Sequence, residues 1–92
     1  MLESVVEVVN PLGLHARAAA KLVRLAGSFR SKVMLHRIDR DSEANAKSIL
    51  SVLALAAGHG TKLQLRVEGE DEATACEAIK EMFAAGFGEL AD

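Results

Sequence analysis

The chain has 92 residues, of which 50% are apolar and 26% are charged; this balance is typical of a folded domain and excludes a disordered chain. A net charge of −2 and the lack of Trp and Tyr argue against a protein that binds nucleic acid through basic surface and stacked rings. The single cysteine excludes an internal disulfide, and the longest apolar run, residues 52–57, is far shorter than the roughly 20 residues of a membrane span. Because the N-terminus is acidic and unlike a signal peptide, we expect one cytoplasmic domain over residues 1–92.

The first third of the chain predicts a strand, a loop and a helix. Residues 2–9 are rich in β-branched side chains and predict a strand, and the loop Asn10–Gly13 follows it. A helix then extends to about Ala26 and is ended by Gly27 and Ser28. Its apolar residues recur every three or four positions and form one face: Leu14, Ala18, Leu22, Leu25 and Phe29.

The remaining chain predicts three strands and two helices. They are a strand over 32–38, a short edge strand over 43–45, a helix over 46–57, an alternating strand over 61–68, and a helix capped by Asp71 that runs to about residue 85. Residues 86–92 are expected to form a loose tail. The order β-α-β-β-α-β-α predicts an α+β domain whose helices pack on one face of an antiparallel sheet.

His15 is the first candidate for chemistry, because it follows a Pro/Gly loop and opens a helix. The first amides of a helix lack intrahelical partners and favour anions, and a neutral imidazole can carry a covalent phosphoryl group. Such a group would meet the amides of Ala16, Arg17 and Ala18, and the Arg17 guanidinium suits phosphate oxygens. The alternative is a helix-capping histidine beside a solvated arginine, and spacing alone leaves both interpretations open.

Ser48 is the second candidate, in the first turn of the second predicted helix. A phosphate there would be favoured by the helix dipole, although a plain capping serine fits the pattern equally well. The contexts of His15, His36 and His59 are unrelated and predict no metal site. Cys76 lies on an apolar stripe and is expected in the core, and no group of residues predicts autonomous catalysis or a cofactor.

Taken together, these segments resemble the HPr family, the histidine-containing phosphocarriers of the phosphoenolpyruvate-dependent phosphotransferase system. Residues 10–19 read Asn-Pro-Leu-Gly-Leu-His-Ala-Arg-Ala-Ala and closely resemble the family's active-site segment. Residues 46–50, Ala-Lys-Ser-Ile-Leu, resemble its regulatory serine segment, and residues 58–61 and 69–72 match its C-terminal half. The resemblance covers about residues 3–87.

The resemblance implies a role for each matching residue. His15 matches the histidine that phosphorylated enzyme I modifies on Nδ1, and Arg17 matches the arginine that stabilises the phosphoryl group. Ser48 matches the serine modified by HPr kinase/phosphorylase in bacteria that have that enzyme. A docking surface on the first two helices is implied, comprising Leu14, Ala20, Lys21, Arg24, Lys47, Ile49, Leu50 and Leu53.

The family fold implied is an open-faced β-sandwich with strand order 1-4-2-3 and three helices on one face. The resemblance also implies a monomeric carrier, itself no enzyme, that passes the group from enzyme I to EIIA-type acceptors for sugar uptake and its regulation. The chain departs from most members at Ala18, where they have proline. Its Phe83-Ala84-Ala85-Gly86-Phe87 ending resembles the nitrogen-related branch, whereas Lys47-Ser48 favours the carbohydrate branch.

Two other functions stay open at this point. One is a regulatory interaction protein, in which phosphorylation of Ser48 switches binding to a transcriptional regulator or an enzyme. The other is a small ferredoxin-like metabolite-binding domain, which would explain the order of elements but not the Gly-Leu-His-Ala-Arg string at residues 13–17.

Overall fold

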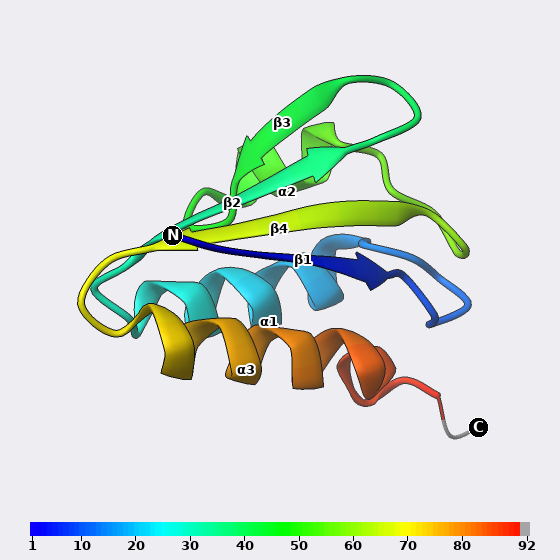
Figure 1. Ribbon diagram of the computed structural model, residues 1–92. Helices are drawn as coiled ribbons and strands as arrows, with labels where there is room; N and C mark the ends of the chain where they lie inside the picture. The colour runs from blue at the N-terminus through cyan, green and yellow to red at the C-terminus, as the bar shows by residue number, and fades with distance from the viewer. Residues whose placement is uncertain (91–92) are drawn as a thin grey trace.

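The computed structural model describes residues 1–90, and within them four antiparallel strands form a sheet in the order β1-β4-β2-β3. The elements are β1 (Leu2–Glu7), α1 (Ala16–Gly27), β2 (Lys32–Arg37), β3 (Ser42–Asn45), α2 (Ile49–Ala54), β4 (Lys62–Glu68), α3 (Glu72–Ala84) and the 3₁₀ turn η1 (Gly86–Gly88). Figure 1 shows α1 and α3 side by side beneath the sheet, with α2 near β3. The predicted α+β class, the 1-4-2-3 order and the edge position of β3 are confirmed.

Alternation along β2 and β4 separates the two faces of the sheet. Val33, Leu35, Leu63, Leu65 and Val67 are fully buried toward the helices, as the sequence pattern predicts. They meet the apolar stripes of the helices in one core. Each strand is a residue or two shorter than predicted, except β3, which begins one residue earlier.

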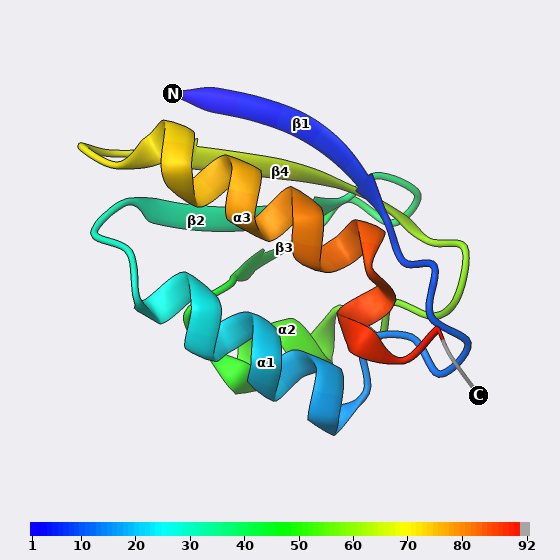
Figure 2. The same ribbon diagram turned by 90° about the horizontal axis from the view of Figure 1, so that it is seen from below.

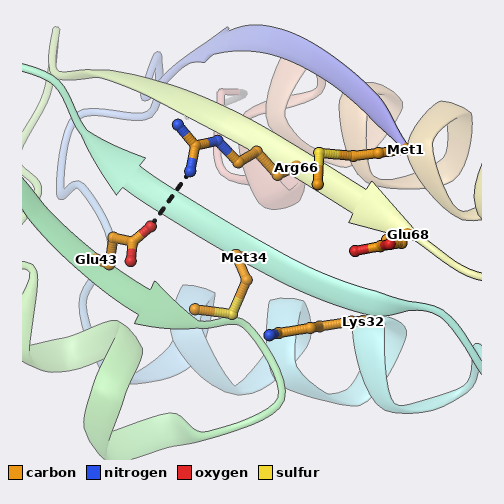
Figure 3. A pocket seen from close by; sticks show the side chains of 6 residues that line it. All are labelled: Met1, Lys32, Met34, Glu43, Arg66 and Glu68. Carbon is orange, nitrogen blue, oxygen red and sulfur yellow. Dashed lines mark ion pairs between the residues drawn. The ribbon is translucent and has the colours of Figure 1, made fainter.

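The opposite face of the sheet is open and carries charged side chains. Figure 3 shows a shallow pocket on this face, lined by Met1, Lys32, Met34, Glu43, Arg66 and Glu68. Arg66 pairs with Glu43 at 3.5 Å and with Glu3 at 3.4 Å, so acidic neighbours balance its charge. The face resembles the solvated side of an ordinary antiparallel sheet.

Small side chains bring α1 close to its neighbours. The buried residues of α1 are Ala18, Ala19, Leu22 and Ala26, and those of α3 are Ala75, Cys76, Ile79 and Phe83. The expectation that Cys76 is a core residue is therefore confirmed. Helix α1 contacts both α3 and α2, and Figure 2 shows α2 behind α1 in the view from below. No helix within residues 1–90 is long and apolar enough to cross a membrane.

Helix α2 is shorter than the predicted span of residues 46–57. Its start is delayed because the Ala46 amide bonds to the Val33 carbonyl, and Ser48 then acts as the N-cap. Its end comes early because Ala56 adopts a left-handed backbone with a φ of 51°. The buried Arg37 donates to the carbonyls of Leu55 and Ala56, both at 2.8 Å, and so satisfies the end of the helix.

Two further expectations are wrong. Asp71 occupies the N-cap position of α3, but its side chain makes no capping bond there; it accepts hydrogen bonds from Arg30 and Ser31 across the fold instead. The tail predicted as loose is ordered as far as it is described, because Phe87 is buried and packs edge-to-face on Phe83 with ring centroids 5.0 Å apart. Residues 91 and 92 lie outside the described range.

Candidate functional site

His15 is the N-cap of α1, as its place after the Pro/Gly loop indicates. Its backbone is extended, and its Nδ1 accepts the Arg17 N–H at 3.3 Å. The preceding loop is fixed by Gly13, whose φ is +71° and whose missing Cβ would lie 2.7 Å from the Ala57 carbonyl oxygen. Leu14 then donates its amide to the same carbonyl at 2.9 Å. The loop therefore delivers the imidazole to the start of the helix in one defined position.

The first turn of α1 offers donors to an anion bound at Nδ1. No acidic side chain lies in this turn, and the Arg17 amide already points at the ring nitrogen. The Ala18 amide makes no hydrogen bond within residues 1–90, while the Ala19 amide bonds to the His15 carbonyl and closes the first turn. The side chain of Arg17 is exposed, so its guanidinium is available to a bound oxyanion.

The other side of the imidazole faces a carboxylate that sequence reasoning missed. Nε2 of His15 lies 2.9 Å from both carboxylate oxygens of Glu89, which stands just after the 3₁₀ turn. The side chains of His15 and Glu89 are 28% and 13% exposed, so the contact is half-buried while the Nδ1 side stays open. The hydrogen bond from His15 is the main cause that holds the pKa of Glu89 below its usual value.

A buried asparagine joins the loop before α1 to this carboxylate. Nδ2 of Asn10 donates to the Gly13 carbonyl at 2.8 Å and to Oε1 of Glu89 at 3.0 Å. Both neighbours are acceptors, which fixes the amide with its nitrogen toward them. Asn10 and Glu89 are 79 positions apart in sequence, and only the fold makes them neighbours.

The regulatory candidate, Ser48, is half-buried at the start of α2. Its Oγ accepts the Ser51 N–H at 3.3 Å, so it is a capping residue one position before the helix rather than a residue of the first turn. The apolar side chains that follow are exposed, with Leu50 at 77%, Ile49 at 38% and Leu53 at 37%.

The other docking candidates fall into three groups. Arg24 is exposed on α1, and Ala20 is partly exposed. Lys21 donates to the Phe87 carbonyl at 2.7 Å and Lys47 to the Phe29 carbonyl at 2.8 Å, so both ammonium groups are held against the backbone. Leu14 is only 5% exposed because it belongs to the core, and its place on a docking surface is therefore wrong.

The three histidines lie in unrelated places. His36 is on β2 with Nε2 3.3 Å from Asp41, and His59 is exposed in the loop before β4. Within residues 1–90, no group of three or more His, Cys, Asp or Glu side chains is placed to hold a metal ion.

Taken as chemistry, the site is an accessible imidazole nitrogen beside helix amides and an exposed guanidinium. Such a nitrogen can receive a phosphoryl group and hand it on, because the neighbouring amides and guanidinium can stabilise the phosphoryl oxygens. An α+β open-faced sandwich with such a histidine suits the class of small carriers of phosphoryl groups.

Comparisons with known proteins identify the particular family. Residues 2–85 match the family model described as the PTS HPr component phosphorylation site. The chain is 49% identical over 89 residues to the phosphocarrier protein HPr of Xylella fastidiosa strain Temecula1, covering 97% of this chain and 98% of the relative. It is 46% identical over the same length to the HPr of Cupriavidus necator, again with 97% and 98% covered.

A solved structure gives the same result. The crystal structure of HPr from Thermoanaerobacter tengcongensis superimposes with a TM-score of 0.91 at 36% identity, covering 97% of this chain and 98% of that one. The chain belongs to the HPr family and is a phosphocarrier of the phosphotransferase system, which serves phosphoryl transfer in sugar uptake and is not itself a catalyst. Its family interacts with enzyme I and EIIA-type proteins.

Proposed function

We propose that His15 is the phosphoryl acceptor of this carrier and that Nδ1 is the atom that reacts. The observation that supports this most strongly is the ring's position: Nδ1 lies at the exposed start of α1 and the Arg17 amide points toward it. The Nδ1 lone pair forms the bond to phosphorus, while the bond from phosphorus to enzyme I breaks and its electron pair stays with enzyme I. Transfer to an EIIA-type acceptor follows the same path in reverse.

The amides of Ala16, Arg17 and Ala18 and the Arg17 guanidinium are proposed to stabilise the phosphoryl oxygens. An incoming phosphoryl group takes the Nδ1 lone pair from the Arg17 amide, which then donates to a phosphoryl oxygen instead. The side chain of Arg17 is free to turn toward the group because it is exposed. These donors favour the dianion without making a covalent bond themselves.

The proposed docking surface lies on α1 and α2 beside His15. Without the buried Leu14, it comprises Ala20, Lys21, Arg24, Lys47, Ile49, Leu50 and Leu53. An apolar centre with a basic border suits an acidic partner surface that also carries apolar contacts. Enzyme I and EIIA-type proteins would use it in turn, since both must reach the same nitrogen.

Ser48 is proposed as a regulatory phosphorylation site, for HPr kinase/phosphorylase where the cell has it. Its hydroxyl is half-buried and accepts one hydrogen bond, and it precedes the exposed Ile49 and Leu50 directly. A phosphate there adds nearly two negative charges to the border of the docking surface. Such a change suits control of partner choice, including binding to a transcriptional regulator.

We also propose that the carrier acts as a monomer and a single domain over residues 1–92, in the cytoplasm. The site residues Asn10, His15 and Glu89 all come from one copy of the chain, so a second copy is not needed to complete it. A free, buried Cys76 is compatible with a reducing compartment.

The experiment is phosphorylation from phosphoenolpyruvate with Mg²⁺ and enzyme I, followed by mapping of the label. We expect an acid-labile phosphoryl group on His15 and none on the His15→Ala variant, which should stay folded. His59→Ala, at an exposed loop histidine, is the matched control and should be labelled like the wild type. Label on His15→Ala would contradict the assignment.

A further inference from the structure

The two nitrogens of His15 have neighbours of opposite character. Nδ1 accepts an N–H from the Arg17 backbone at 3.3 Å, and Nε2 lies 2.9 Å from both oxygens of Glu89. An ionised carboxylate only accepts hydrogen bonds and a backbone amide only donates them. Both neighbours therefore select the same neutral tautomer, with the proton on Nε2 and the lone pair on Nδ1.

We propose that Glu89 is a positioning residue for phosphoryl transfer: it holds the proton of His15 on Nε2 and balances the positive charge that the ring gains when Nδ1 bonds to phosphorus. This inference rests on the proposed role of His15 as the acceptor. It assigns to the C-terminal segment a part in the reaction, acting through His15 rather than on the phosphoryl group itself.

The charge balance of the step gives the carboxylate its effect. When the neutral ring accepts the phosphoryl group at Nδ1, it keeps its proton on Nε2 and becomes cationic beside the phosphoryl dianion. When the group leaves for the acceptor, the electron pair of the P–N bond returns to Nδ1 and the ring is neutral again. A carboxylate at 2.9 Å stabilises the cationic ring more than the neutral one, as the carboxylate of a catalytic triad does for its imidazolium. Glu89 thus favours the phosphorylated state and the transition states that lead to it.

The fold holds Glu89 in place from three sides. Phe87 is buried against Phe83 and has a φ of 56°, which turns the chain back toward α1. Lys21 donates to the Phe87 carbonyl at 2.7 Å, and Asn10 donates to Oε1 of Glu89 at 3.0 Å. This support fixes the carboxylate on the closed side of the ring and leaves Nδ1 accessible to partners.

The kinetic test compares Glu89→Ala and Glu89→Gln with Glu70→Ala, which removes the same charge at an exposed position next to Asp71. We measure the initial rate of His15 labelling by enzyme I over a range of carrier concentrations. For Glu89→Ala we expect kcat to fall about 10-fold with KM changed by less than about 2-fold, because the charge acts on the ring and not on docking. Glu89→Gln keeps the length and an acceptor oxygen but not the charge. Its kcat should therefore lie between that of Glu89→Ala and that of the wild type.

A spectroscopic measurement separates positioning from general loosening of the C-terminal segment. In ¹⁵N spectra of the unphosphorylated protein, His15 should show the Nε2–H tautomer, with a proton that its carboxylate partner protects from exchange. That proton signal should be lost in Glu89→Ala and kept in Glu70→Ala. It should also remain in Glu89→Gln, whose amide oxygen can still accept it.

Three results would overturn the inference: a kcat for Glu89→Ala equal to that of Glu70→Ala, a loss confined to KM, or a wild-type kcat for Glu89→Gln. Failure of the proposed function looks different, because His15→Ala would then still take up label. If the wild type is labelled only on His15 and the Glu89 variants keep the wild-type kcat, the role of Glu89 is rejected while that of His15 stands.

Discussion

Two carboxylates tie distant parts of the chain together at opposite ends of α1, and only one of them faces the proposed phosphoryl acceptor. After the C-terminal end of the helix, Asp71 accepts hydrogen bonds from the amides of Arg30 and Ser31, each at 2.9 Å, and from the Ser31 hydroxyl. At the N-terminal end, Glu89 accepts from the imidazole of His15 and from Asn10. Both carboxylates join segments at least 40 positions apart, yet their partners differ in kind.

The partners decide what each carboxylate does. The donors around Asp71 keep the same charge throughout the life of the protein, and the Ser31 hydroxyl is the main cause that lowers the pKa of Asp71 to about 2. That interaction can only stabilise the fold. The partner of Glu89 is a ring that alternates between neutral and cationic in the proposed transfer, so the energy of its contact changes with the reaction. In this proposal, the same side-chain chemistry serves stability at one end and phosphoryl transfer at the other.

After the loss of label expected for His15→Ala, the next largest effect is expected for Arg17→Ala, near the same end of α1. We expect enzyme I-dependent labelling of His15 to slow by about 10- to 100-fold without being abolished, because the helix amides still stabilise the phosphoryl group. The melting temperature should change by less than about 2 °C, since the side chain is exposed. Arg40→Ala removes the same charge from the exposed β2–β3 turn and should leave the rate unchanged. A wild-type rate of labelling for Arg17→Ala would contradict the proposed role of the guanidinium in stabilising the phosphoryl group.

Asp71→Asn is expected to lower the stability of the fold and to leave phosphoryl transfer unchanged, the reverse of Arg17→Ala. The amide keeps the size of the side chain but cannot accept all the hydrogen bonds from Arg30 and Ser31, so we expect the melting temperature to fall by roughly 5–10 °C. Labelling of His15 at a temperature where the variant is folded should stay within about 2-fold of the wild type. Glu70→Gln, at the preceding exposed residue, is the control and should melt like the wild type. A loss of transfer in folded Asp71→Asn would break the division between the two ends.

The pH dependence of unfolding tests whether the ionised carboxylate of Asp71 stabilises the fold. Because the pKa of Asp71 is about 2 in the fold and near its ordinary value of about 4 in the unfolded chain, its contribution to stability is complete above about pH 4 and is lost as the pH falls through about 2. The difference in unfolding free energy between the wild type and Asp71→Asn should therefore shrink over this window. Chemical denaturation at a series of pH values measures it. If this difference in unfolding free energy stays constant down to pH 2, the ionised carboxylate of Asp71 is not what stabilises the α1–β2 loop.

A smaller effect is expected for Ser48→Asp, which adds one charge at the start of α2. The basic border of the docking surface becomes less positive, so the initial rate of His15 labelling should fall at limiting enzyme I concentration. The melting temperature should fall by no more than about 2 °C, since a negative charge at a helix N-terminus is tolerated. Thr74→Asp, on the exposed side of α3, is the control for the added charge. An unchanged rate would place Ser48 outside the docking surface.

The smallest effect is expected for Ala18→Pro, which tests how the first turn of α1 contributes to stability. The Ala18 amide makes no hydrogen bond within residues 1–90, so proline removes no bond and should stabilise the fold by about 0.4–1 kcal/mol through the unfolded chain. Ala18 is also fully buried, and the ring has to fit beside the core. A thermal melt against the wild type measures the balance. A clear loss of stability would show that crowding exceeds the entropic gain.

Local patterns were sufficient to predict most of the elements and to single out His15 as a candidate, although its role came from the family resemblance. Alternation from Leu63 to Val67 and the apolar spacing along α1 specify a strand and a helix by themselves, because burial of one face is a property of short-range periodicity. The position of His15 after a Pro/Gly loop likewise predicts the helix N-cap that the structure shows. These features depend on residues fewer than about ten positions apart, and no knowledge of the fold is needed to find them.

The partners across the fold could not be predicted in this way. Asp71 has the sequence context of a helix cap, yet the fold brings other donors from the α1–β2 loop within its reach. Residues 46–57 read as one helix, but strand pairing at Ala46 and the left-handed Ala56 confine α2 to its centre. A signal for the ordered segment 86–90 was present in the apolar Phe87 between two glycines, although it does not say which surface the ring covers.

The contact between Glu89 and His15 is the clearest case of what only the tertiary structure decided. The two residues are 74 positions apart, and no periodicity links them. Their meeting depends on three long-range conditions at once: α1 packed against α3, Phe87 buried on Phe83, and Asn10 turned toward both the loop and the carboxylate. The sequence alone determined that a histidine would stand at the start of a helix, and the family resemblance already implied Nδ1 as the reacting nitrogen. Only the packing of the chain determined that a carboxylate contacts the other nitrogen, Nε2.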